Sequence, residues 1–312
     1  MNPLFWLNVQ SATTQVVILY LLVFVGFVLT KAKLFSASTA GHLIDMVLYV
    51  ATPCVLIDSF LKMEPTSAHI RSFFLSFGLM ALTHFIAIGL SLPFFRRQDS
   101  LNPIFKYASV YGNVGFIALP LAQAILGAEG VFYCANGYIV FNVITFIHGI
   151  KLMAGRHYHM DWRKLVFNPG VISVLIGLPL FLLGVKLPTV LAKPIEYLGN
   201  LNAPLGMLIF GAYLARTDLK TLFREKRIYL VALLKLVVLP GLCICLYRLI
   251  GVRGVLLVAC CITACVPSGN NTFMFASKFH KDVGVGSKTV ALVSAFSLVT
   301  MPLMIAAAQA MQ

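Results

Sequence analysis

Apolar residues run along this chain in long stretches that short polar segments separate. A helix of about 20 apolar residues is long enough to cross the roughly 30 Å hydrocarbon layer of a bilayer. The pattern therefore predicts an all-α integral membrane protein with ten transmembrane helices. Their expected ranges are 14 to 31, 41 to 62, 71 to 95, 103 to 126, 130 to 152, 169 to 187, 191 to 214, 228 to 250, 253 to 277 and 284 to 308.

Composition agrees with this pattern. Of the 312 residues, 60% are hydrophobic and only 11% are charged, which is more apolar surface than a soluble fold of this length buries. The longest polar segments, 153 to 168 and 215 to 227, are too short for a separate soluble domain. The opening stretch "MNPLFWLNVQ" lacks the basic segment and cleavage site of a signal peptide, so we expect the first span to be retained.

The net charge of +14 raises the question of a nucleic-acid partner, but its distribution argues against one. With the N-terminus outside, 17 of the 24 Lys and Arg residues fall in inner loops and six in outer loops, while Lys235 lies within a span. Loops rich in Lys and Arg face the cytoplasm. We therefore predict a multi-pass protein of the cytoplasmic membrane, in contact with lipid, with both termini outside. The seven cysteines all lie in apolar stretches without a paired CxxC motif, and no metal or cofactor is predicted.

The two halves of the chain repeat the same motifs. An acidic residue precedes a proline by eight positions in "DMVLYVATP" (45 to 53) and again in "EYLGNLNAP" (196 to 204). The spacing G-N-x-x-F occurs at 112 to 116 and again at 269 to 273. Because each half holds five spans, the second half enters the membrane inverted. We therefore predict two inverted five-helix repeats, residues 1–152 and 169–312, joined by a cytoplasmic linker at 153–168.

Helix-breaking residues interrupt the fourth and ninth spans at equivalent positions. The fourth holds "YGNVGFIALP" and the ninth holds "CVPSGNNTF". Glycine frees the backbone and proline removes a hydrogen-bond donor. Inside a bilayer such a break is tolerated only where protein or a water-filled cavity surrounds it. Close packing of small residues explains an isolated Gly-xx-Gly, but the matching pair favours two broken helices in the protein interior.

Two broken helices in opposed repeats indicate the midplane binding site of a transporter. The N-terminal ends of half-helices carry partial positive charge and free N–H groups that attract a carboxylate, and uncharged amides can orient it. The predicted substrate-binding residues are Gly112, Asn113, Gly115, Pro120, Pro267, Ser268, Gly269, Asn270, Asn271 and Thr272.

Four further polar residues are candidates to line the cavity or to couple transport: Tyr111, Asn142, Asn202 and Lys235. Three of them have an alternative explanation. Hydrogen bonding between helices accounts equally well for the two asparagines. The flexible stem of Lys235 can reach the membrane surface instead of the interior.

At these residues the chain resembles the auxin efflux carrier family, the PIN-like carriers of plants and their bacterial relatives. The resemblance covers essentially the whole chain and is strongest in "GNVGFIALPL", "VPSGNNTFMFASKF" and "NPGVISVLIGLPLFLLG". It implies a scaffold of helices 1, 2, 6 and 7, often a homodimer interface. It also implies a moving transport domain of helices 3–5 and 8–10, in which helices 4 and 9 cross. The long cytoplasmic loop of plant members is reduced here to 153–168, which favours a microbial carrier of small organic anions.

We therefore expect a secondary transporter of a malate-like mono- or dicarboxylate, working by an elevator-type alternating-access mechanism. The alternative is a sodium- or proton-coupled symporter or antiporter of the bile-acid-symporter-like fold. That alternative calls for carboxylates or a dense cage of oxygens at the crossing, and neither interruption holds an Asp or Glu. An enzyme is not expected, because the sequence holds no HExxH, GxSG or paired intramembrane aspartates.

Overall fold

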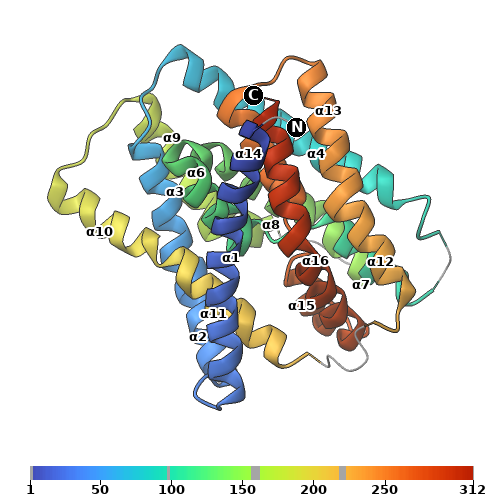
Figure 1. Cartoon of the computed structure of the whole chain (residues 1–312). Coiled ribbons are helices and arrows are strands. Elements are labelled where there is room, and N and C mark those ends of the chain that lie inside the picture. Colours follow the sequence, from blue (N-terminus) through green and yellow to red (C-terminus); the bar gives the residue numbers. More distant parts are fainter. Residues whose placement is uncertain (1–2, 97–98, 156–161, 218–222, 312) are drawn as a thin grey trace.

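The computed structural model describes residues 3–96, 99–155, 162–217 and 223–311, and in these ranges every regular element is helical. The prediction of an all-α protein is confirmed for them. The helices pack into one bundle, and the start of α1 and the end of α16 lie at the same end of it (Figure 1). Part of the predicted linker, 156 to 161, lies outside the described residues.

Most spans consist of more than one helical element, and short π-helical turns (η) join several of them. In the first half the elements are α1 (Pro3–Lys31), α2 (Ala37–Met46), η1 (Val47–Ala51), α3 (Thr52–Leu61), α4 (Ser67–Ser91), α5 (Asn102–Val110), η2 (Val114–Ala118), α6 (Leu119–Ile144), η3 (Thr145–Gly149) and α7 (Ile150–Ala154). In the second half they are α8 (Trp162–Val166), α9 (Pro169–Leu182), α10 (Thr189–Asn200), α11 (Asn202–Ala215), α12 (Lys226–Leu233), η5 (Leu234–Val238), α13 (Leu239–Leu249), α14 (Gly254–Cys265), α15 (Asn271–Lys278) and α16 (Val283–Ala310).

Seven helical stretches of the described residues are long and apolar enough to cross a membrane, which supports a multi-pass membrane protein. The number differs from the expected ten for two reasons. Some expected spans are short or interrupted, among them α9 and the pair α14 and α15. In addition, the continuous stretch Val114–Ala154 joins two expected spans, but Gly127 within it has φ 66° and ψ −154°. Only glycine adopts such a conformation readily, so the chain changes direction there.

Three of the four described π-helical turns end two residues before a proline. η1 precedes Pro53, η2 precedes Pro120 and η5 precedes Pro240. A proline in a helix has no N–H to donate, and its ring clashes with the carbonyl one turn earlier. Widening the preceding turn relieves this clash without ending the helix. The prolines thus explain why these spans bend but continue.

Helices α1 and α11 approach each other so closely that their backbones touch. A Cβ atom on Gly211 would lie 1.9 Å from the carbonyl oxygen of Val23, and one on Gly26 would lie 2.2 Å from that of Leu208. Close backbone approach at glycine positions is a common means of packing helices in membranes. On another side, α1 packs against α16, where the Tyr20 hydroxyl donates to the carbonyl of Ser294 at 2.8 Å. The first helix is therefore held between two helices of the second half of the chain.

Candidate functional site

The two predicted interruptions are present and lie against each other. α5 and α14 both end early, and the extended segments that follow them form an isolated antiparallel bridge between Gly112 and Ser268. Beside it, the backbone N–H of Asn113 donates to the carbonyl of Pro267 at 2.8 Å. Buried backbone groups need such partners. Each broken helix therefore supplies partners that the other one lacks.

Further contacts hold this crossing together. The N–H of Gly269 donates to the carbonyl of Tyr111 at 3.0 Å, and the buried hydroxyl of Ser268 donates to the carbonyl of Ala108 at 2.8 Å. A Cβ atom on Gly269 would lie 3.0 Å from the carbonyl oxygen of Gly112. The two backbones thus meet without room for a side chain between them.

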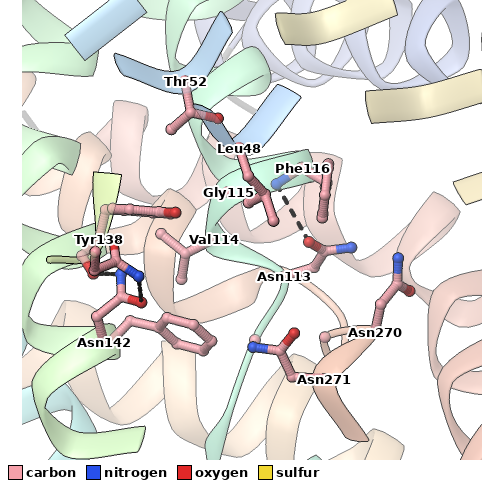
Figure 2. Close-up of a pocket in the computed structure, with 14 residues that line it drawn as sticks. Leu48, Thr52, Asn113, Val114, Gly115, Phe116, Tyr138, Asn142, Asn270 and Asn271 are labelled. Atoms are coloured by element: carbon pink, nitrogen blue, oxygen red, sulfur yellow. Dashed lines mark hydrogen bonds between the residues drawn. The ribbon is translucent and has the colours of Figure 1, made fainter. Parts of the chain in front are cut away.

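Two helices begin at the crossing. Asn113 is the N-cap of η2, where its Oδ1 accepts a hydrogen bond from the Phe116 N–H at 3.3 Å (Figure 2), and η2 continues as α6. At the other interruption, which follows α14, helix α15 begins at Asn271, directly after Asn270. Helix starts carry unpaired N–H groups and partial positive charge. Both starts therefore favour a negatively charged group nearby.

A cavity of about 170 Å³ lies beside the crossing, and both helix starts contribute to its wall (Figure 2). Its polar side chains are amides and hydroxyls, and none of its lining residues is Asp, Glu, Lys or Arg. The lining residues are Leu48, Thr52, Gly112, Asn113, Val114, Gly115, Phe116, Tyr138, Phe141, Asn142, Asn168, Gly269, Asn270 and Asn271.

Two amides in this wall have unused hydrogen-bonding capacity. Asn270 is 4% exposed, and among the described residues neither its Nδ2 nor its Oδ1 has a partner; the Nδ2 of Asn113 also has none there. Figure 2 shows these amides at the same point of the crossing. A buried polar atom without a partner costs about 1–3 kcal/mol. Such atoms in a cavity wall are typical of a binding site whose ligand supplies the partner.

The structure brings only part of the predicted site to the cavity. Seven of the predicted residues line it: Gly112, Asn113, Gly115, Asn142, Gly269, Asn270 and Asn271. Seven do not: Tyr111, Pro120, Asn202, Lys235, Pro267, Ser268 and Thr272. Of these, Pro267 and Ser268 make hydrogen bonds that hold the crossing together. Pro120 lies in the first turn of α6, just after η2. Thr272 is fully buried in α15, and its hydroxyl has no partner among the described residues.

Two of the candidates outside the cavity differ in how they relate to its wall. Tyr111 points away from it, with its hydroxyl 2.8 Å from the Nδ1 of His148. The Nδ2 of Asn202 donates to the hydroxyl of Thr52 at 2.7 Å, and Thr52 is a lining residue. For Asn202 the structure shows the hydrogen bond between helices, and this bond is made to a residue of the cavity wall.

Sequence reasoning missed Thr52, Tyr138 and Asn168. The Nδ2 of Asn168 donates to the Oδ1 of Asn142 at 3.2 Å, and the Nδ2 of Asn142 donates to the carbonyl of Tyr138 at 2.7 Å. Asn168 also caps α9 by accepting the N–H of Gly170 at 3.0 Å. The Asn-Pro pair that opens α9 is a recognisable helix start and was the one available signal.

Lys235 is buried rather than turned toward a membrane surface. It is 2% exposed, and its Nζ donates to the carbonyl of Val110, the last residue of α5, at 3.3 Å. A Cβ atom on Gly112 would lie 3.1 Å from this Nζ. Since Gly112 also lines the cavity, the ammonium group lies close to a residue of the cavity wall.

Comparison with known proteins agrees with a transport role. The family described as "Membrane transport protein" matches residues 11–159 and 156–305. An uncharacterized transporter of Methanocaldococcus jannaschii is 23% identical over 92% of this chain and 96% of its own length. A Rhizobium meliloti protein named "Putative malonate transporter" is 23% identical over 89% of this chain and 90% of its own length. Auxin efflux carrier component 1 of Arabidopsis thaliana is 31% identical over 40% of this chain, which corresponds to 21% of the plant protein.

Proposed function

The chain belongs to the membrane transport protein family that includes the auxin efflux carriers, and from this we propose that it is a secondary transporter of a small organic carboxylate. One observation carries the choice of substrate class. The cavity at the crossing combines two helix starts with the unpaired amides of Asn113 and Asn270, and no acidic side chain lines it. This arrangement offers hydrogen-bond donors to an anion, and its lining carries no negative charge that would repel one.

The size of the cavity narrows the substrate further. A cavity of about 150 Å³ holds one benzene molecule, and the cavity here is of similar size, about 170 Å³. A dicarboxylate of three or four carbons, such as malonate or malate, fits this volume. The printed name of the Rhizobium relative points to the same class. We therefore take malonate-like and malate-like acids as the first candidates.

The position of the cavity supports an elevator-type mechanism. In the proposed division, ten transmembrane helices form two inverted repeats, residues 1–152 and 169–312, with helices 1, 2, 6 and 7 as a scaffold. Thr52 and Asn168 then belong to the scaffold side, while Asn113 and Asn270 belong to the transport domain. The cavity thus lies at the boundary between the two groups of helices. Sliding of the crossing along the scaffold would carry a bound anion across the membrane.

The remaining parts of the proposal follow from the sequence. Two copies of the chain would associate through the scaffold helices, and the protein would lie in the cytoplasmic membrane with both termini outside. The alternative, a sodium- or proton-coupled carrier of the bile-acid-symporter-like fold, is less well supported, because no carboxylate lines the cavity among the described residues.

Uptake into proteoliposomes tests the proposed function. We expect flux of radiolabelled malonate or malate by the wild-type protein and strong loss of flux in Asn270→Ala. Asn200→Ala, an exposed asparagine at the end of α10, is the matched control and should transport normally. Unchanged flux in Asn270→Ala would reject this site. Absence of both uptake and thermal stabilisation across a panel of mono- and dicarboxylates would reject the substrate class.

A further inference from the structure

The last carbonyl oxygens of α5 lie at the crossing. Side chains from other segments of the chain donate hydrogen bonds to them. Ser268 donates to the carbonyl of Ala108, and the Lys235 ammonium donates to the carbonyl of Val110. The end of a helix carries partial negative charge, which favours a cation. In transporters with broken helices, such carbonyl ends commonly hold the coupling sodium ion or proton. In this protein the cation at the end of α5 is the ammonium group of Lys235.

Among the described residues, no buried carboxylate neutralises this cation. No Asp or Glu is buried among the described residues. The titratable groups that interact electrostatically with Lys235 are His84, Cys243 and Cys265, and none of them is a carboxylate. A buried charge without a counter-ion is costly. The cavity lined by Gly112 offers a space in which an anion can lie close to Lys235.

Gly112 makes this closeness possible. Gly112 lines the cavity, and a Cβ atom on it would lie 3.1 and 3.3 Å from the Nζ and Cε of Lys235 and 2.8 Å from the Cγ2 of Val266. A larger residue would displace the ammonium group. Because the Lys235 ammonium group is buried, attraction between it and an anion in the cavity is screened less than attraction between two exposed charges.

We propose that the Lys235 ammonium is the built-in cation of this carrier. It takes the place of a bound sodium ion at the end of α5 and supplies the positive charge that balances a carboxylate in the cavity. This inference rests on the proposed function, because it assumes that a carboxylate binds there. Two consequences follow: binding of the anion needs no sodium, and it depends on the charge of Lys235.

Binding of malonate to the purified full-length protein tests both consequences, with affinity read by calorimetry and by thermal stabilisation. The wild-type protein should bind malonate equally well in sodium chloride and in choline chloride. In Lys235→Met, which keeps a similar volume without the charge, the affinity should fall at least about tenfold. The melting temperature of that variant without ligand should not fall, because removing an unpaired buried charge relieves its cost. Lys226→Met, an exposed lysine at the start of α12, is the matched control and should bind like the wild type.

The outcomes separate this proposal from the proposed function. If the wild-type protein binds no carboxylate of the panel, the proposed function fails and this inference fails with it. If the wild-type protein binds malonate only in sodium, a bound sodium ion is needed and Lys235 does not replace it; this result needs no variant. Equal affinity in Lys235→Met and wild type would overturn the inference alone. Lost affinity together with a lowered melting temperature would assign Lys235 a structural role and overturn it as well.

Discussion

The backbone N–H of Asn113 donates to the carbonyl of Pro267 at 2.8 Å, which joins the interruptions of the two halves of the chain directly. The reciprocal bond runs from the N–H of Gly269 to the carbonyl of Tyr111 at 3.0 Å. Neither interruption therefore satisfies its own backbone. The crossing is a single unit made from both halves, and the cavity lies against it.

Replacing Asn113 with Asp separates its two roles. The Asp side chain can still accept the Phe116 N–H and cap η2, so the fold should persist. Its negative charge, however, would face an anion in the cavity. We expect carboxylate uptake to fall by at least about tenfold, which corresponds to about 1.4 kcal/mol of lost binding, with little change in melting temperature. Uptake at the wild-type rate would show that no anion approaches Asn113.

Gly269→Ala should force the crossing apart. The added methyl group would lie 3.0 Å from the carbonyl oxygen of Gly112, a backbone atom that cannot rotate away. Overpacking of this kind costs about 1–3 kcal/mol, so both the melting temperature and carboxylate uptake should fall. Gly241→Ala in α13, which has open space around its Cβ position, serves as the control. A variant at 269 with normal stability and uptake would contradict the tight contact.

Gly211→Ala should weaken the fold without changing the site. The methyl group would lie 1.9 Å from the carbonyl oxygen of Val23, so α1 and α11 would have to separate. We expect a loss of about 1–3 kcal/mol in stability, measured as a lower melting temperature in detergent. Malonate affinity of the folded fraction should stay the same. Gly78→Ala in α4, with no neighbour near its Cβ position, should be neutral or slightly stabilising.

An ion-pair cluster at the start of α12 should make stability depend on pH. The Leu101 N–H and the Arg227 guanidinium both bond Asp99 and lower its pKa, and Arg227 likewise lowers the pKa of Glu225. Carboxyl groups with lowered pKa in the folded state add stability above the pKa of the unfolded state and lose it as pH falls through the folded value. The contribution should thus be full near pH 6, begin to decline at about pH 4 and be lost only below the lowered pKa values of the folded state.

Comparison of the wild-type protein with Arg227→Met checks this expectation. The variant should melt at a lower temperature than the wild type at neutral pH, and the difference should shrink as the pH falls below about 4. The effect should be small, because these side chains are partly exposed. A difference that stays constant with pH would mean that Arg227 acts through its contact with the Phe105 ring, 4.7 Å from the guanidinium carbon, rather than through the carboxylates.

Much of this architecture was predictable because its signals are local. The interruption at Gly112 and Asn113 is visible as helix breakers in an apolar stretch, and its counterpart at Gly269 and Asn270 repeats the same spacing. The positions of both breaks therefore follow from backbone chemistry alone. The contact between them does not follow so directly, and it was inferred from the inverted repeat.

The missed residues depend on packing between distant segments. Thr52 is an ordinary helix residue in the sequence, and it reaches the cavity because α3 packs beside the crossing. Lys235 differs from Thr52, because the sequence marks it as a candidate but leaves the direction of its side chain open. Its distance from the end of its span is compatible with reaching the membrane surface, and only the tertiary contact with Val110 shows that it points inward. Sequence position fixes how far along a helix a side chain lies, whereas its direction depends on the neighbouring helices.

The mutual bonding of the two interruptions has a consequence for biogenesis. The segment around Asn113 leaves the ribosome roughly ten to thirty seconds before Pro267 at ordinary rates of synthesis. During that interval its N–H has no partner from the second half, so we expect the first half to wait in the translocon, or in contact with an insertase or chaperone, until the ninth span arrives. Premature release of nascent chains that end before the ninth span should then lead to degradation rather than to a stable half-protein.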